Sequence, residues 1–133
     1  MFEPGELLKL AMGAHVLWIA LLYALLTIVR APSAWGIGRR PDGTNPWSEV
    51  EPRVSANLTN QFEWPLLFYV ACVLLLIEPE TIATAQAVLA WVFVGGRVVH
   101  SCVQISTTGV RLRGAVFTLN FVAVLGMWGL WLA

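Results

Sequence analysis

The chain has 133 residues, of which 58% are hydrophobic and 12% are charged, and its formal net charge is zero. This composition indicates an integral membrane protein, and the length suits a single domain. A neutral chain gives no reason to expect nucleic acid as a partner, and Cys72 and Cys102 lie in apolar runs at a separation that does not match a zinc site.

The first predicted span covers residues 7–29. Leu10–Val29 holds 20 consecutive residues without a charge, which is enough to cross a hydrocarbon core, and Arg30 and Pro32 follow directly. Because the residue before a proline disfavours helical geometry, we expect the helix to end before Pro32. His15 lies inside this span, where it is expected to form a hydrogen bond to a neighbouring helix.

A polar loop is predicted over residues 30–52, which contain four prolines, three arginines and an Asp-Gly turn signal. The second span, over residues 53–77, then presents a length problem. Trp64–Ile77 supplies only 14 uncharged residues, so the helix must include the polar residues before it. Glu63 inside a bilayer would cost about 2.5–3.5 kcal/mol, so we expect it to face a protein interior or an aqueous cavity. Pro65 is expected to bend this helix.

The third span, over residues 82–105, repeats this problem. Ile82–Gly96 contains 15 uncharged residues, so the helix must carry Arg97 and His100 with it. Gly114–Ala133 supplies 20 uncharged residues for a fourth span at 114–132. The sequence therefore predicts an all-α integral membrane protein, a four-transmembrane-helix bundle that forms one domain over residues 1–133.

Four alternating spans place the 30–52 and 106–113 loops on one side of the membrane. Most arginines flank those loops, so the positive-inside rule predicts that both loops are cytoplasmic and both termini are on the opposite side. The polar residues of the second and third spans also lie near this side. They form faces too wide for one subunit to cover, so we expect a homo-oligomer.

The polar residues of the two inner spans fall on helical faces. Arg97, His100 and Gln104 stand at i, i+3 and i+7 on the third span. The second span carries its own polar face, formed by Arg53, Asn57, Asn60, Gln61 and Glu63. A Glu63–Arg97 ion pair is the simplest structural interpretation, but it leaves most of these residues unexplained. The sequence contains no phosphate loop, HExxH motif or Cys/His cluster, and we predict no metal site.

Two motifs resemble one membrane-protein family. Arg53 with Asn60-Gln-Phe-Glu63-Trp-Pro65, and Gly96-Arg97-Val-Val-His100 followed by Arg113, resemble the membrane-associated proteins in eicosanoid and glutathione metabolism, the MAPEG family. That family includes microsomal glutathione transferases and the leukotriene-C and prostaglandin-E synthases. The resemblance covers essentially the whole chain. It implies a homotrimer that binds glutathione, as cosubstrate, between neighbouring subunits near the cytoplasmic face.

The resemblance also implies roles for individual residues. Asn60, Glu63 and Arg53 correspond to residues that hold the polar groups of glutathione, His100 to a site residue, and Arg30 to a carboxylate-binding arginine. Arg113 corresponds to the catalytic arginine that stabilises the glutathione thiolate, with Arg97 and Gln104 on the adjoining face. A thiol titrates near ~8.5, so lowering its pKa by about two units stabilises the nucleophile by roughly 2.7 kcal/mol.

The chain also departs from the synthases of this family. Ala56, Leu58 and Thr59 stand where active synthases carry basic residues, and Gln104 stands where some family members place a tyrosine. An eicosanoid substrate is therefore not implied. The first hypothesis is a glutathione-dependent transferase or peroxidase that acts on lipophilic electrophiles arriving through the bilayer. The second is a non-catalytic or lipid-binding relative whose polar cluster serves trimer assembly. A small drug/proton exporter is disfavoured because the first span has no interior acid.

Overall fold

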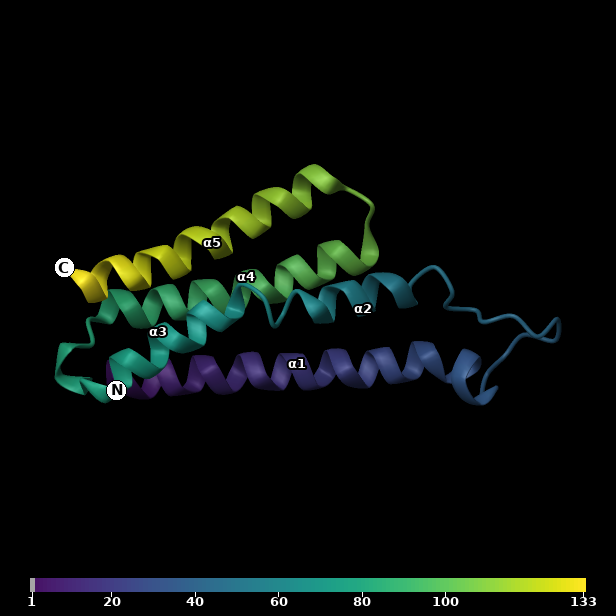
Figure 1. Ribbon diagram of the computed structural model, residues 1–133, viewed down its shortest axis with the longest axis horizontal. Coiled ribbons are helices and arrows are strands. Elements are labelled where there is room, and N and C mark those ends of the chain that lie inside the picture. The colour runs from purple at the N-terminus through teal and green to yellow at the C-terminus, as the bar shows by residue number, and fades with distance from the viewer. Residues whose placement is uncertain (1) are drawn as a thin grey trace.

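The protein is an elongated bundle of helices, seen in a computed structural model that describes residues 2–133 (Figure 1). The helices are α1 (Pro4–Trp35), α2 (Glu51–Thr59), α3 (Pro65–Ile77), α4 (Thr84–Ser106) and α5 (Val110–Leu132), with a short 3-10 turn, η1 (Pro79–Thr81). Across these described residues there is no strand. The expectation of an all-helical chain is therefore confirmed. The number of helices differs, because two of them follow one another along one pass of the bundle.

Three helices are long and apolar enough to cross a membrane: α1, α4 and α5. Helix α3 is apolar but has only 13 residues, and at 1.5 Å per residue it reaches only about 20 Å of the roughly 30 Å of hydrocarbon. Large apolar side chains such as Leu17, Ile28 and Leu119 are exposed on the outer faces. These features support a membrane protein, in agreement with the composition.

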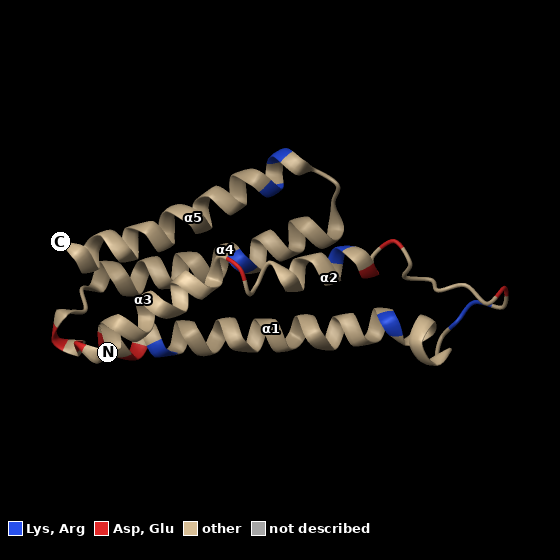
Figure 2. Ribbon diagram, in the orientation of Figure 1, with Lys and Arg blue, Asp and Glu red and all other residues tan. Residues whose placement is uncertain are grey.

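The two ends of the bundle differ in charge. The long loop after α1 and the short α4–α5 loop lie at one end, whereas both termini and η1 lie at the other (Figure 1). Most Lys and Arg side chains gather toward the loop end, and the terminal end is mainly acidic (Figure 2). Four alternating passes would give this arrangement, but only three helices within residues 2–133 qualify as membrane spans by length and composition, so the fourth span stays a prediction. That the loop end is cytoplasmic stays a prediction.

The sequence predicts that α1 ends before Pro32, but this prediction is wrong: the helix continues to Trp35. Its last carbonyls find partners outside the helix: Asn45 Nδ2 donates to the Val29 carbonyl at 3.0 Å, and Arg39 Nε donates to the Pro32 carbonyl at 2.6 Å. Gly36 then ends the helix with φ of 74°, a left-handed conformation that glycine adopts without strain. Side chains of the following loop thus bond to carbonyl groups in the last two turns of α1.

The predicted helix over residues 53–77 is divided. Helix α2 ends at Thr59 and α3 begins at Pro65, so the irregular segment lies before the proline, not at it. Pro65 has no N–H for the Gln61 carbonyl. Within the segment, Gln61 and Phe62 donate their N–H groups three residues back, to Leu58 and Thr59. Irregular backbone is tolerated at membrane depth only where protein or water covers it, and here the guanidinium of Arg97 bonds to the Asn60 carbonyl.

Two apolar clusters flank this break. The larger one packs Leu8, Phe68, Phe93 and Met127 together from α1, α3, α4 and α5. The smaller one joins the second half of α1 to α2, through Leu22, Leu26, Val29, Val54 and Leu58. Along α1, His15 lies between the residues of the two clusters. The polar residues therefore form a layer between two apolar regions, at the level of the α2–α3 break.

Candidate functional site

Gln61, in the break, is the centre of a buried hydrogen-bond network. Its Nε2 donates to Asn57 Oδ1 and to Ser101 Oγ, each at 3.2 Å. Its Oε1 accepts from Arg97 Nε at 3.1 Å and lies 3.1 Å from His15 Nε2. Every one of these side chains is buried. A single amide thus joins α1, α2 and α4 to the irregular segment.

The network continues to α1 and α3. His15 Nδ1 lies 2.8 Å from the Tyr69 hydroxyl, so a His15 protonated at Nε2 donates to Gln61 and accepts from Tyr69. Trp18 Nε1 donates to Ser101 Oγ at 3.1 Å. The prediction that His15 bonds to a neighbouring helix is confirmed. Ser101 lies four residues after Arg97 and could have been found by helical spacing, whereas nothing in the sequence pattern identifies Tyr69 or Trp18.

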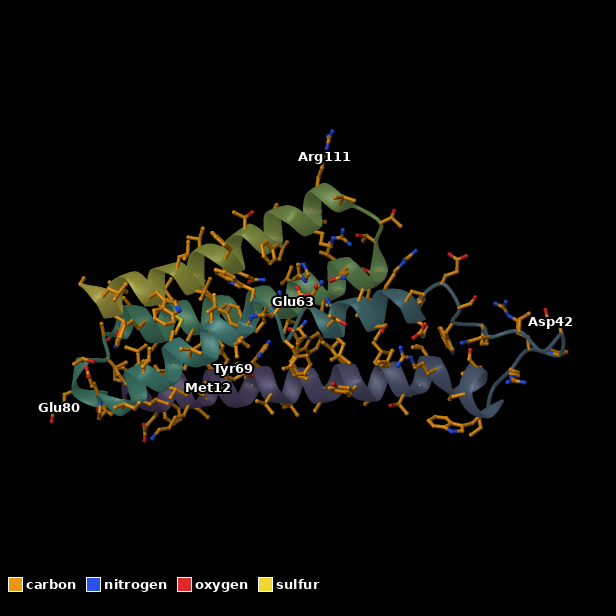
Figure 3. All side chains as sticks on the ribbon, in the orientation of Figure 1. Met12, Asp42, Glu63, Tyr69, Glu80 and Arg111 are labelled. Carbon is orange, nitrogen blue, oxygen red and sulfur yellow. The ribbon has the colours of Figure 1, made fainter. Side chains whose placement is uncertain are left out.

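A cleft opens on the other side of the break, between α4 and α5. Its volume is about 700 Å³, which lies within the range of small-molecule sites. Figure 3 labels Glu63, a residue of the break, near the middle of the bundle. The polar residues of the cleft are Asn60, Glu63, His100, Gln104 and Arg113, and its apolar residues are Trp64, Val110, Gly114 and Phe117. Most of the site residues predicted from the sequence are thus brought together.

Gln104 connects the cleft to the buried network. Its Oε1 accepts from Asn57 Nδ2 at 2.9 Å and from Asn60 Nδ2 at 3.3 Å. Arg53 lies beside the cleft, in a smaller depression that shares Gln104 and Arg113 with it. Its Nη1 is 3.5 Å from the Ile105 carbonyl. The two arginines therefore flank Gln104 at the loop end of the cleft.

Arg97 does not line the cleft, although the sequence grouped it with the binding residues. It is fully buried, and its Nη2 donates to the Asn60 carbonyl at 2.9 Å. The expected ion pair with Glu63 is absent: in residues 2–133 the only ion pair joins Arg30 to Glu51, at 2.6 Å. Because Arg97 bonds instead to backbone and amide oxygens of the break, Glu63 is left exposed at the cleft. The interpretation of Glu63 and Arg97 as a simple structural pair is wrong.

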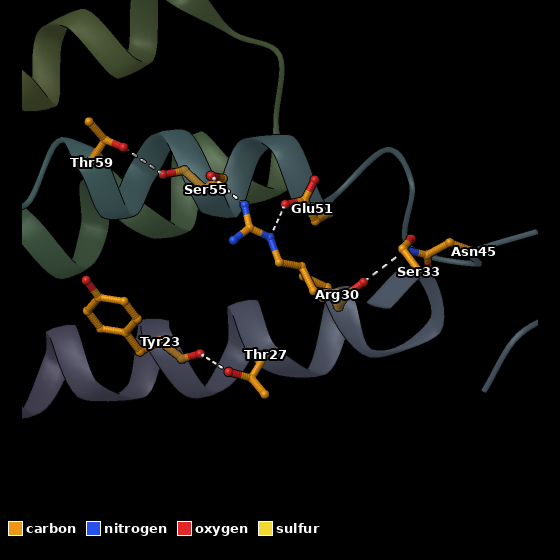
Figure 4. Close-up of polar contacts among 9 residues, drawn as sticks. Tyr23, Thr27, Arg30, Ser33, Asn45, Glu51, Ser55 and Thr59 are labelled. Carbon is orange, nitrogen blue, oxygen red and sulfur yellow. Dashed lines mark hydrogen bonds and ion pairs between the residues drawn. The ribbon is translucent and has the colours of Figure 1, made fainter. Parts of the chain in front are cut away.

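Arg30 also lies apart from the cleft within this chain. It sits between α1 and α2, where its guanidinium bonds to Glu51 and, at 3.1 Å, to Ser55 Oγ (Figure 4). The Glu51 carboxylate already compensates the positive charge of Arg30. The role of Arg30 as a carboxylate-binding residue stays a prediction.

The chemistry of the cleft follows from its side chains. Arg113 is exposed in the first turn of α5 and supplies a permanent positive charge, while Glu63 supplies a carboxylate. Asn60 and Gln104 add amides, and Trp64 and Phe117 add apolar walls. Such a cleft suits a small molecule that carries carboxylate and ammonium groups together with an apolar second molecule.

The comparisons with known proteins gave one match. The sequence model of the MAPEG family matches residues 8–133, essentially the whole chain. No curated protein and no solved structure matches.

Proposed function

The chain belongs to the MAPEG family, and from this membership we propose that it is a membrane-embedded, glutathione-dependent transferase or peroxidase acting on lipophilic electrophiles. At the level of the family, a membrane role in glutathione or eicosanoid metabolism follows from the match itself. The choice of glutathione chemistry and the catalytic role of Arg113 are our proposal.

One observation carries the proposal: Arg113 opens into the same cleft as Glu63, Asn60 and Gln104. Glutathione has two carboxylates, one ammonium group and a thiol, so it needs cationic, anionic and amide partners within a small space. Glu63 would hold the ammonium group, and the amides would hold peptide groups. Arg113 would stabilise the thiolate, because a guanidinium keeps its charge and favours the deprotonated sulfur.

The apolar walls support a lipophilic second substrate. Trp64 stacks on Phe121 with ring centroids 4.5 Å apart, and Phe117 lies beside them. The cleft is lined by α4 and α5, two of the helices that can cross the membrane, so a lipid-soluble electrophile could reach it from the bilayer. We also propose the homotrimer, since Glu63 is exposed at a depth where contact with lipid would be costly.

A non-catalytic or lipid-binding relative is the second candidate, and one observation favours it. Gln104, where some family members are expected to carry a tyrosine, is engaged by Asn57 and Asn60. With its amide oxygen already bonded twice, Gln104 supplies less to a ligand than a phenol would. In this alternative the polar cluster holds the subunits together.

Conjugation of glutathione to an aromatic halide by the purified protein in nanodiscs tests the proposal. Thermal stability is measured in parallel with millimolar glutathione and with S-methylglutathione, which keeps the carboxylates and ammonium group but has no free thiol. We expect turnover, and stabilisation by both molecules. Stabilisation without turnover would favour the non-catalytic relative, and the absence of both would refute glutathione binding.

A further inference from the structure

The smaller depression beside the cleft has a charge of one sign. Its volume is about 330 Å³, at the lower limit of small-molecule sites. It is lined by Arg53, in the first turn of α2, and by Arg113, near the start of α5, at the positively charged loop end (Figure 2). None of the acidic residues within residues 2–133 lines it. The other lining residues are Pro52, Ala56, Gln104, Thr107 and Thr108.

Neither arginine of the depression has an acidic partner in the part of the chain that the structure describes. The one ion pair there joins Arg30 to Glu51 at 2.6 Å, so the acid nearest to Arg53 in the sequence is already engaged. Arg53 Nη1 lies 3.5 Å from the Ile105 carbonyl, which is long for a hydrogen bond. The positive charges of Arg53 and Arg113 are therefore available to an anion.

The depression and the cleft differ in the charges that they can compensate. Gln104 and Arg113 line both of them, but Glu63 lines only the cleft. A molecule that carries ammonium and carboxylate groups together therefore finds partners for both charges in the cleft alone. The depression suits a group with negative charge only. Phosphate is such a group, and arginine binds its oxygens with two parallel N–H bonds.

The position of the depression favours a lipid as the source of this phosphate. Arg113 lies near the start of α5, a helix long and apolar enough to cross the membrane, and the neighbouring Val110 and Leu112 are exposed apolar residues. A headgroup in the depression would leave its acyl chains beside the apolar surface of α5. Basic pockets between helices on the cytoplasmic side of a membrane bind anionic headgroups, and the sequence predicts that the loop end is cytoplasmic.

We propose that the depression between Arg53 and Arg113 binds the phosphate of an anionic phospholipid whose headgroup has no ammonium group, such as phosphatidylglycerol. The two guanidinium groups donate to the phosphate oxygens, and exposed Thr108 adds a hydroxyl beside them. This inference goes beyond the proposed function, because it needs neither glutathione nor catalysis. Its test contains no thiol, so a failure of the lipid site leaves the thiol chemistry standing, and a failure of the thiol chemistry leaves the lipid site standing.

The test uses the full chain in nanodiscs made from equal amounts of phosphatidylglycerol and phosphatidylcholine with the same acyl chains. Native mass spectrometry counts the lipids that stay bound when the protein leaves the disc. We expect phosphatidylglycerol to be retained about ten-fold over phosphatidylcholine, a difference of about 1.4 kcal/mol. Equal retention of the two lipids would overturn the proposal. Displacement of phosphatidylglycerol by millimolar inorganic phosphate would show a site for a free anion and would overturn the lipid assignment.

A matched pair of variants at Ala56 locates the effect. Ala56 is exposed on α2 and lines the depression. Ala56→Glu adds a carboxylate to the lining of the depression and should abolish the preference for phosphatidylglycerol. Ala56→Gln adds a neutral amide of the same size and should keep that preference. Glutamate and glutamine are both good helix formers, so both variants should fold. Equal retention of phosphatidylglycerol by the two variants would overturn the proposal.

Arg53→Gln removes one of the two cations directly. The ratio of retained phosphatidylglycerol to phosphatidylcholine should fall from about ten to about one. Arg111→Gln is the control, because it removes the same charge from the same end of the bundle, where Arg111 points away from the other helices and does not line the depression (Figure 3). Similar losses in the two variants would show a general attraction of anionic lipids to the loop end, and would overturn a specific site.

Discussion

The two sides of the α2–α3 break use polar residues in opposite ways. On the side of α1, Gln61, His15 and Tyr69 satisfy one another inside the bundle. On the side of α5, Glu63 is exposed and His100 Nδ1 has no hydrogen-bond partner, counted over residues 2–133. Polar side chains at one membrane depth therefore serve two purposes. Those that are mutually bonded hold the helices together, and those that are unpaired face a cleft and are available to a ligand.

The largest effect is expected on the bonded side. Gln61→Leu would leave Arg97 Nε, Asn57 Oδ1 and His15 without their common partner, and should lower the free energy of unfolding by about 3–5 kcal/mol. Unfolding in mixed micelles measures this loss. Thr59→Val is the control, because exposed Thr59 donates only to the Ser55 carbonyl one turn before it. Equal stability of the two variants would contradict a supporting role for the network.

On the cleft side, Arg113→Gln should reduce function and leave the fold intact. Removing the guanidinium should raise the pKa of bound glutathione by about two units, from about 6.5 to about 8.5, so the thiolate fraction and the rate of conjugation at pH 7 should fall about 25-fold. Thiolate absorbance over a pH series and kcat/KM measure these changes. Arg111→Gln is a matched control, because Arg111 points away from the bundle on the same turn of α5 (Figure 3). Similar losses in both variants would show a general charge effect and no specific role for Arg113.

Gly95 and Gly96 of α4 differ in the space around them, so replacing each with alanine should change stability in opposite directions. At Gly96 an added Cβ meets the Asn120 amide, whereas at exposed Gly95 nothing lies within 4 Å. Gly96→Ala should cost about 1–3 kcal/mol of stability because α4 and α5 must move apart. Gly95→Ala should gain about 0.5–1 kcal/mol from helix propensity. Thermal unfolding of the pair measures both signs, and a neutral Gly96→Ala variant would show that Asn120 can move.

The smallest effect concerns the loop after α1, far from the cleft. The Thr44 hydroxyl donates to Asp42 Oδ1 at 2.6 Å, and the Thr44 N–H donates to it at 2.9 Å. These bonds, the hydroxyl above all, lower the pKa of the Asp42 carboxyl. The charged form therefore stabilises the folded loop above the ordinary carboxyl pKa, and this contribution disappears as pH falls through the lowered pKa. The protection of the residue 40–44 amides against hydrogen exchange, taken relative to the intrinsic exchange rate at each pH, should fall at acidic pH. Thr44→Val should weaken this pH dependence without changing the free energy of unfolding, because the backbone N–H still donates to Asp42.

Much of the fold could be predicted because membrane spans depend on local composition. The uncharged run Leu10–Val29 was sufficient to predict α1, and the shortage of apolar residues after Trp64 predicted that polar residues are drawn to membrane depth. The spacing of His100 and Gln104 on one face also placed them correctly at the cleft. Each of these inferences needs only helical geometry and the thickness of a bilayer.

The partners of the polar residues could not be predicted, since partner choice depends on three-dimensional distance. Charge alone favoured Glu63 as the partner of Arg97. The helix breaks before Pro65, however, and the guanidinium bonds instead to the Asn60 carbonyl and the Gln61 side-chain amide. The sequence did not identify Asn120 as a buried polar residue of interest, because a single amide in an apolar helix forms no periodic pattern. The break also required tertiary structure: Arg97, on another helix, donates to the Asn60 carbonyl inside the irregular segment.

By itself, the amino-acid sequence determined the membrane environment, the all-helical class, the family and most of the residues around the cleft, because these depend on composition, spacing and motif. Only the tertiary structure decided that Arg97 of α4 bonds to the irregular segment between α2 and α3, that Glu63 stays unpaired, and that Asn120 lies against Gly96. The physical reason is that hydrogen-bond partners are chosen within about 3 Å, and residues far apart in the chain come that close only after the helices have packed.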